Sequence, residues 1–367
     1  MFAPSTFAAR RARLAADLDD GLVVLLGNDA EPMNYPANRF PFRQDGSFRY
    51  VARADAPGLA LTLDAATSEA TLYGREATLE DKVWDGEVPS LRQRADAAGI
   101  EHTAAPDALP DAVRRAQQAG RTVHVLPPYR ASTRLRLASL LGVAPDAIEP
   151  SEALLDAVIA QRIIKTDEEV AEIERAIEIA AEMHRTAMRL AQPGRTEYQV
   201  AAALEAVALR EGSHLSFPAI VTTRGEVPHH HASAHVLQAG DLLLHDAGCV
   251  APGSGYCSDI TRVSPVGGTF SERQRAIYDL VLAAQVACID ACAPGVSFRE
   301  IHDLASRTLA AGLVEIGLLR GDVDEIVPAG AHAAFFHHGL GHPMGLDVHD
   351  LEALGEDRVG YGDEATR

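Results

Sequence analysis

The chain has 367 residues, of which 52 are acidic and 33 are basic, so its formal net charge at pH 7 is −19. A surface this negative repels nucleic-acid phosphates and anionic lipid headgroups, which excludes nucleic acid and membrane surfaces as expected partners. No apolar run reaches the roughly 18 residues that a membrane helix needs. The N-terminus has no signal-peptide pattern, and the four cysteines form no CxxC pair. The composition therefore predicts a reduced, cytoplasmic protein.

Residues 1–150 are predicted to form an α/β domain, because short apolar strands alternate with helices along this part of the chain. The expected strands are 21–27, 59–63, 69–73 and 122–126, and the expected helices are 10–20, 90–98 and 109–118. Turn residues between the second and third strands predict a hairpin. No glycine-rich phosphate-binding motif occurs in the sequence, so a nucleotide-binding role has no support.

A second domain is predicted over residues 151–367, where helix-start and helix-stop signals recur. Capping boxes at 166–169 and 271–274 each begin a long helix, and each helix stops at a Pro-Gly pair, at 193–194 and 294–295. A second helix and an apolar, histidine-containing segment follow each time. This pattern predicts duplicated helix-helix-strand halves with a site between them; chance similarity of helix-stop signals is the alternative. The buried face expected for the first long helix is Val170, Ile173, Ile177, Ala180, Ala181 and Ala187.

Two apolar segments between the helix pairs each contain an aspartate. Residues 240–248 predict a buried strand that carries Asp246, and residues 256–263 predict a second strand that carries Asp259. Side chains alternate along strands, so a hairpin can place both carboxylates on one face. They would repel each other and be costly to desolvate unless a cation lies between them. A divalent metal could provide that charge, or Arg262 could.

Four histidines and two aspartates lie within residues 335–350. His338 and His342 have the spacing of a helical zinc-protease pair, but two glycines and a proline between and after them disfavour a helix. A strand or tight loop is therefore predicted, with further ligands from elsewhere. His342 and the two aspartates form an Asp/Asp/His set that suits Mn, Co or Zn. Candidates for substrate contact or proton transfer, each with a purely structural histidine as the alternative, are His229, His338 and His349.

These motifs together resemble the pita-bread metallopeptidase family, which includes aminopeptidase P, prolidase, methionine aminopeptidase and creatinase. The matching segments are Asp246-Ala247-Gly248, Ser258 to Arg262, Gly267 to Phe270 with Gln274 and Tyr278, His338 to His342, and Gly345 to Asp350. The first domain resembles that of aminopeptidase P through Phe42 to Asp45, Phe48, Tyr50 and Trp84 to Gly86. The expected fold class is α/β (α+β), with an N-terminal creatinase/aminopeptidase P-type domain followed by an incomplete pita-bread catalytic domain.

The resemblance implies an Xaa-Pro aminopeptidase, which releases the N-terminal residue from peptides whose second residue is proline. Proline fixes φ and lacks an amide hydrogen, so its peptide bond needs a dedicated pocket. The implied cofactors are two divalent metal ions, usually manganese, that share a hydroxide nucleophile. The implied ligands are Asp246, Asp259 and His342. By the same resemblance His229 and His349 hold the substrate and stabilise the gem-diolate, and His338 lines the site.

The sequence departs from the family pattern in two places. The aspartates are 13 residues apart, which is longer than the family spacing and indicates a loop insertion. The family also uses two glutamates beyond the histidine motif, and the printed sequence ends at Arg367 before either. A C-terminally truncated member is therefore expected, with weak metal binding and little or no activity.

Two alternatives to the aminopeptidase remain from the sequence. One is a prolidase, which prefers dipeptides. The other is a catalytically inactive member that binds peptides or partner proteins. The family resemblance further implies a homo-oligomer in which the N-terminal domain shapes the site of a neighbouring copy.

Overall fold

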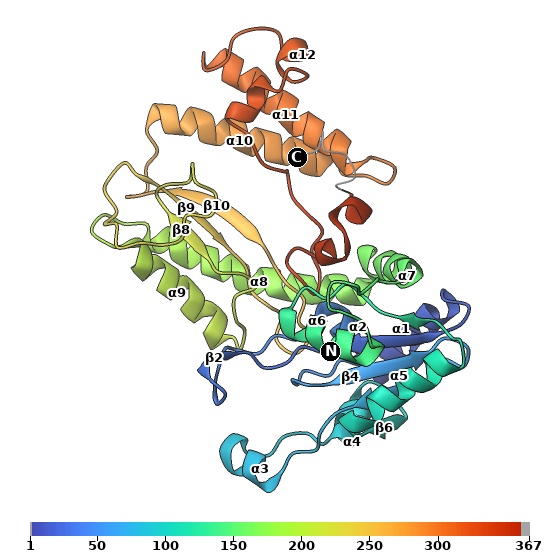
Figure 1. The fold of residues 1–367 in the computed structure, drawn as a ribbon. Helices are drawn as coiled ribbons and strands as arrows, with labels where there is room; N and C mark the ends of the chain where they lie inside the picture. Colours follow the sequence, from blue (N-terminus) through green and yellow to red (C-terminus); the bar gives the residue numbers. More distant parts are fainter. Residues whose placement is uncertain (1, 361–367) are drawn as a thin grey trace. The chain divides into compact units, whose positions relative to one another are not determined.

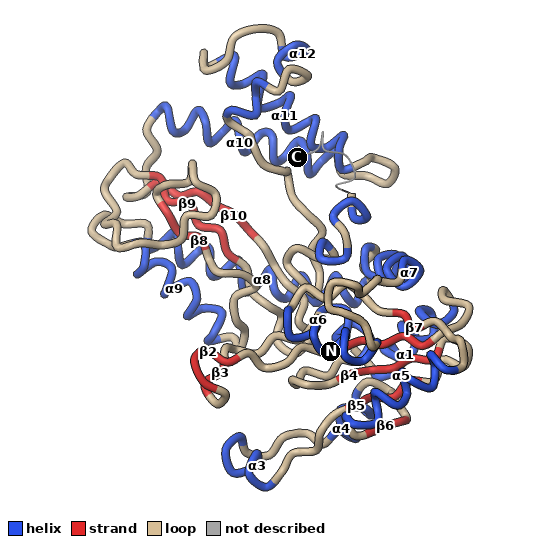
Figure 2. Tube along the Cα trace, in the orientation of Figure 1, coloured by secondary structure: helices blue, strands red, loops and turns tan. Residues whose placement is uncertain are grey.

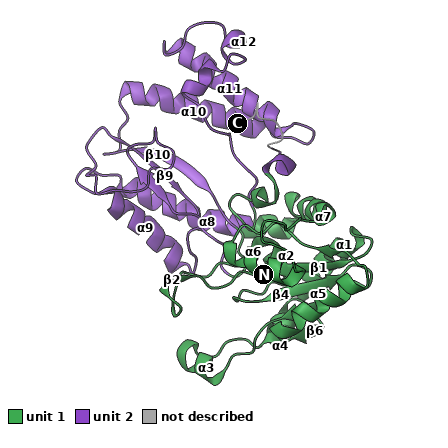
Figure 3. Cartoon of the chain, viewed as in Figure 1, with its two compact units in different colours: residues 1–172, 253–256, 345–355 green, residues 173–252, 257–344, 356–367 purple. Residues whose placement is uncertain are grey.

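The computed structural model describes residues 2–360, which form two compact units (Figures 1 and 3). Unit 1 comprises residues 1–172, 253–256 and 345–355, and unit 2 comprises residues 173–252, 257–344 and 356–367. Each unit combines separate stretches of chain, and the domain boundary between residues 150 and 151 stays a prediction. Within the described residues, no helix has both the length and the apolar character needed to span a bilayer.

Unit 1 is organised around a mixed sheet with the strand order β6-β5-β4-β1-β7 (Figure 2). The strands are β1 (Leu22–Leu26), β4 (Ala60–Asp64), β5 (Ala70–Tyr73), β6 (His102–Ala104) and β7 (Val123–His124). The predicted hairpin is confirmed, because β4 and β5 pair in antiparallel register. β1 is antiparallel to β4 and parallel to β7. All of β1 is buried, as expected for a strand with helices on both sides.

Helices cover both faces of this sheet. Side chains of α5 (Leu109–Gln118) and α6 (Ala131–Leu141) share one core cluster with β1 and β4. On the other face, α1 (Pro4–Ala16), α2 (Gly46–Ala52) and α4 (Leu91–Ala97) contact β4, β1 and β5. The sheet is therefore the central layer of unit 1, and the loops of the unit extend from the ends of its strands.

Several helices of unit 1 differ from the prediction. The first helix begins at Pro4 rather than residue 10, since proline is well tolerated in the first turn, where its missing N–H needs no partner. The remaining elements of unit 1 are β2 (Pro32–Tyr35), β3 (Asn38–Arg39), α3 (Leu79–Asp85), η1 (Pro106–Ala108) and α7 (Glu152–Ile163). Helices α2, α3, α6 and α7 were not predicted.

Unit 2 contains a three-stranded antiparallel sheet with the order β10-β9-β8. Its first elements are α8 (Asp167–Leu190), which belongs to this unit from Ile173 on, α9 (Glu197–Arg210), β8 (Ile220–Thr222), β9 (Leu242–Ala247) and β10 (Ile260–Pro265). Side chains of α8 and α9 form one core with β8 and β9. The predicted buried face of α8 is partly wrong, because Val170 and Ile177 are exposed while Ala176 and Met183 are buried. Small alanines allow α8 to lie close to its neighbours, which selects this face.

The second helix pair of unit 2 has the same kinds of helix start and helix stop as the first pair. It consists of α10 (Glu272–Ala291) and α11 (Phe298–Glu315), and both helices begin at capping boxes. The two Pro-Gly turns are also alike, since Gly194 and Gly295 have φ of 86° and 89°, a left-handed conformation that favours glycine. After β10, the described residues contain no further strand. They form α12 (Val323–Ile326), η2 (Ala331–Ala334), η3 (Glu352–Leu354) and η4 (Glu356–Val359).

Candidate metal centre

The β9–β10 hairpin of unit 2 brings the two predicted aspartates onto one face. Asp246 is directly opposite Thr261, and Asp259 lies two residues before Thr261, so the three side chains point the same way. The Thr261 hydroxyl donates a 2.9 Å hydrogen bond to Asp246 Oδ1. Arg262 is opposite His245 on the other face and donates to the Thr261 carbonyl. Among the described contacts, no arginine bridges the aspartates.

Two histidines support β9 from its buried face. His184 Nε2 lies 3.2 Å from the Ala247 carbonyl, which can only accept, so this nitrogen carries a proton. In the neutral pair, His184 Nδ1 then accepts from His245 Nδ1 at 2.7 Å, and His245 Nε2 accepts from the Ser264 hydroxyl at 2.9 Å. Burial lowers the pKa of both imidazoles, that of His245 to about 3, which keeps them uncharged at neutral pH. Strand β9, which carries Asp246, is therefore held in place by two uncharged histidines whose ring nitrogens are all hydrogen-bonded.

The electrostatics of Asp246 indicate a place for a cation. Burial and the neighbouring Asp259 raise the pKa of its carboxyl group to about 6, against the lowering effects of Thr261 and His229. Two carboxylates held close together in partly buried surroundings are costly for the free protein. A divalent cation between them would remove both the repulsion and the unfavourable desolvation.

His342 provides a third donor group beside these carboxylates. Its Nδ1 lies 3.0 Å from the Pro343 carbonyl, which must accept, and its Nε2 lies 3.0 Å from Asp259 Oδ2. A hydrogen bond from Nδ1–H to a carbonyl is the usual way to fix an imidazole so that Nε2 can bind a metal. Two carboxylates and one such imidazole suit Mn, Co or Zn, so these residues fit a divalent metal ion.

A buried glutamate that the sequence did not single out holds the loop carrying His229. Glu197 in the first turn of α9 is 1% exposed. It accepts hydrogen bonds from the amide and hydroxyl of Thr223 and from the amide and hydroxyl of Ser233. Burial opposes its ionisation, but these donors leave the pKa of Glu197 below its usual value. Both ends of the loop are thus tied to one carboxylate, which limits the positions that His229 can take.

The remaining predicted histidines lie in different surroundings. His338 is exposed and packs edge-on against Phe336, with ring centres 5.0 Å apart. Phe336 in turn stacks on His302 of α11 at 5.2 Å. His349 belongs to unit 1, where its Nδ1 lies 2.9 Å from Glu352 Oε1. Unit 2 therefore brings together Asp246, Asp259, His342 and His229.

Comparisons with known proteins agree with this geometry. Residues 171–365 match the model of metallopeptidase family M24, and residues 7–125 match that of the aminopeptidase P N-terminal domain. The Xaa-Pro aminopeptidase of Escherichia coli is 31% identical over 371 residues, covering 96% of this chain and 82% of the relative. A probable Xaa-Pro aminopeptidase of Chaetomium globosum is 32% identical over 352 residues, covering 95% of this chain and 58% of the relative.

A solved structure extends the comparison to the fold. An alanine-substituted variant of Escherichia coli aminopeptidase P in complex with substrate matches with a TM-score of 0.86 and 30% identity, covering 98% of this chain and 84% of that one. The chain belongs to metallopeptidase family M24 and, within this family of hydrolases, to the Xaa-Pro aminopeptidases of the aminopeptidase P type. The predicted family and the predicted pita-bread fold class are thereby confirmed, and membership implies divalent metal ions as cofactors.

Proposed function

We propose that this protein is a metal-dependent exopeptidase that releases the N-terminal residue from peptides with proline in the second position. The observation that carries the proposal is the convergence of Asp246, Asp259 and His342 on one face of the β9–β10 hairpin. The relatives named above, which are Xaa-Pro aminopeptidases, support the substrate class.

The proposed roles follow from the chemistry of each side chain. Asp246, Asp259 and His342 would hold the metal ions, for which we propose manganese. When bound, the ions supply Lewis acidity and lower the pKa of a water molecule, which makes it a nucleophile. His229 and His349 would bind and orient the peptide through their ring N–H groups, and His338 would line the site. Glu197 would position His229 through the loop contacts described above.

The activity can be tested by cleavage of three peptides in the presence of manganese. An Ala-Pro-Ala tripeptide should release alanine at the low rate that the sequence predicts, a Gly-Pro dipeptide should react more slowly still, and an Ala-Ala-Ala tripeptide should be inert. A clear preference for the dipeptide would instead identify a prolidase. Manganese binding without cleavage of any of the three would favour an inactive, peptide-binding member.

Self-association is the proposed quaternary arrangement, and α3 of unit 1 supports it. Leu79, Val83 and Trp84 are 80%, 71% and 79% exposed, and no residue of this helix is buried. Three apolar side chains grouped on an otherwise uncovered helix are a frequent mark of a protein interface. A second copy of the chain is the partner that we propose. A cytoplasmic location stays a prediction from composition.

Replacement of Trp84 by alanine should shift the protein towards the monomer, because buried tryptophans often contribute about 2 kcal/mol or more to an interface. Sedimentation velocity over a range of concentrations measures the effect. Leu135→Ala is the matched control, since Leu135 is 61% exposed on α6 of the same unit. A monomeric unmodified protein, or an equal effect of both substitutions, would contradict the proposed surface.

A further inference from the structure

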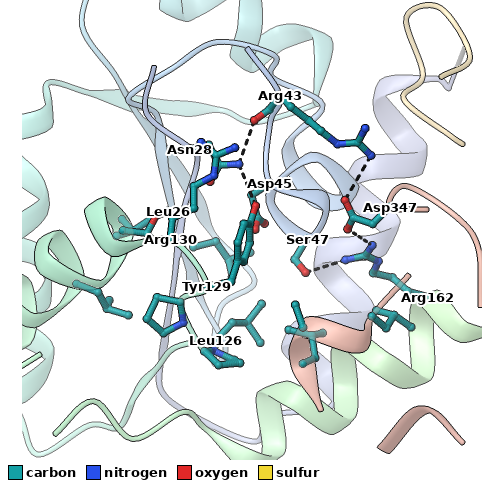
Figure 4. A pocket seen from close by; sticks show the side chains of 18 of the residues that line it. Leu26, Asn28, Arg43, Asp45, Ser47, Leu126, Tyr129, Arg130, Arg162 and Asp347 are labelled. Carbon is teal, nitrogen blue, oxygen red and sulfur yellow. Dashed lines mark hydrogen bonds and ion pairs between the residues drawn. The ribbon is translucent and has the colours of Figure 1, made fainter. Parts of the chain in front are cut away.

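A cavity of about 290 Å³ lies wholly within unit 1 (Figure 4). It opens where the parallel strands β1 and β7 end, next to Asn28 and residues 127–130. This is the position at which open α/β sheets commonly bind ligands. Leu26, Leu126 and Leu137 provide part of the apolar lining. Charged and polar side chains also line the cavity, among them Asp45, Arg130 and His349. A small molecule with both apolar and charged groups would match such a lining.

Most of the charged groups around the cavity satisfy one another. Arg162 donates to Ser47 Oγ at 2.8 Å and to Asp347 Oδ2 at 3.3 Å (Figure 4). Arg43 donates to the Leu346 carbonyl at 3.1 Å and lies 3.7 Å from Asp347 Oδ1. These groups form the fixed wall of the cavity and offer little capacity for a ligand.

Asp45 is a carboxylate of this wall that the charge of Arg162 stabilises without forming an ion pair with it. Its Oδ1 caps helix α2 by accepting from the Phe48 amide at 2.8 Å. In the described part of the chain, no cationic side chain forms an ion pair with it. Burial, together with the charge of Asp347, raises the pKa of Asp45 to about 6. An ammonium group placed beside this carboxylate would relieve an unfavourable charge.

Arg130 is the complementary cation. Its closest carboxylate among the described residues is Glu31, at 3.8 Å and half-exposed, which makes a weak pair. Its guanidinium carbon lies 6.0 Å from the centre of the Tyr129 ring. Burial and, after it, the charge of Asp45 raise the pKa of the same tyrosine. One aromatic side chain thus neighbours both an under-paired anion and an under-paired cation in a single cavity.

We infer that this cavity binds a small zwitterion, either a free amino acid or a dipeptide, with its ammonium group on Asp45 and its carboxylate on Arg130. The leucine lining favours an apolar side chain on the ligand. None of the proposed metal ligands of unit 2 lines the cavity, whereas His349, for which peptide binding is proposed above, does, so the inferred site adjoins that residue.

Titration calorimetry on the chelator-treated chain tests the inference with L-leucine and Leu-Leu as probes. Saturable binding of leucine alone assigns the site to free amino acids, and binding of Leu-Leu alone assigns it to dipeptides. N-Acetyl-leucine lacks the ammonium group and leucinamide lacks the carboxylate, so each should bind at least about tenfold more weakly. Equal binding of the blocked compounds, or no saturable binding of either probe, would overturn the inference.

Matched variants locate the binding within the chain. Asp45→Asn keeps a good helix cap while removing the charge, and it should weaken binding about tenfold or more, as should Arg130→Gln. Arg136→Gln is the control, because Arg136 lies on α6, whose N-cap is Arg130, is equally exposed and has a carboxylate at the same 3.8 Å. Asp246→Asn should also leave binding unchanged, which separates this site from the metal centre. An equal loss in Arg136→Gln would refute the assignment.

Discussion

Replacing Asp246 with asparagine should weaken manganese binding by on the order of a hundredfold or more, since loss of a neighbouring support alone costs about 10- to 100-fold. Asparagine keeps the size of the side chain and the hydrogen bond from Thr261, but it removes one of two negative charges facing the metal position. Hydrolysis of Xaa-Pro peptides should fall with the metal affinity. Asp259→Asn should behave in the same way, because it also removes the carboxylate beside His342.

Thermal unfolding with and without manganese separates metal loss from misfolding. A ligand at roughly 100 times its Kd stabilises the folded state by about 2.7 kcal/mol, and Asp246→Asn should lose this gain. Without metal the variant should be at least as stable as the unmodified chain, because the raised pKa of Asp246 shows that its charge is unfavourable there. Asp279→Asn, an exposed change on α10, is the control. An undiminished manganese shift in both aspartate variants would refute the metal assignment.

Replacing Asp350 with asparagine should lower the free energy of unfolding by about 3 kcal/mol, because a buried arginine then loses its main counter-charge. Arg162 of α7 and Asp350 are 4% and 1% exposed and form a 2.7 Å ion pair. Lys165 adds a second contact to the same carboxylate at 3.0 Å. These bonds hold residues 345–355, the segment that carries His349, against the body of unit 1.

Chemical denaturation measures this effect, and two further variants interpret it. Asp55→Asn breaks an ion pair of Arg49 whose carboxylate is 49% exposed, and such surface pairs contribute only about 0–1 kcal/mol. The double variant Arg162→Met/Asp350→Leu removes both buried charges and should be more stable than Asp350→Asn alone. A loss for Asp350→Asn no larger than that of the surface control would contradict the importance of this pair.

Local signals in the sequence predicted much of the fold correctly. The capping boxes predicted at Thr166 and Ser271 are present in the structure. The β9–β10 hairpin and the common face of Asp246 and Asp259 also followed from the alternation of side chains along strands. Helix caps, turns and strand alternation depend on residues only a few positions apart, so they can be read without knowledge of the rest of the chain.

Features that join distant parts of the chain could not be predicted in this way. No local pattern indicated the His184–His245 pair, the role of Glu197 as the anchor of the loop that carries His229, or the exposure of Ile177. Polar residues within a helix or on a strand's buried face resemble ordinary structural positions until their partners are known. Only the packing of helices on the sheet decides which polar groups meet.

The histidine-rich residues 335–350 have some features that local sequence signals predicted and others that only the tertiary structure determined. Its glycines and proline were enough to exclude a helix, and its motifs were enough to indicate a metallopeptidase. The tertiary structure alone placed His342 Nε2 3.0 Å from Asp259, and it placed His349 beside Glu352 in the other unit. Arg162 meets Asp350 across 188 positions of sequence. Pairing at that separation depends on burial and counter-charge in the folded protein, which no local pattern of residues records.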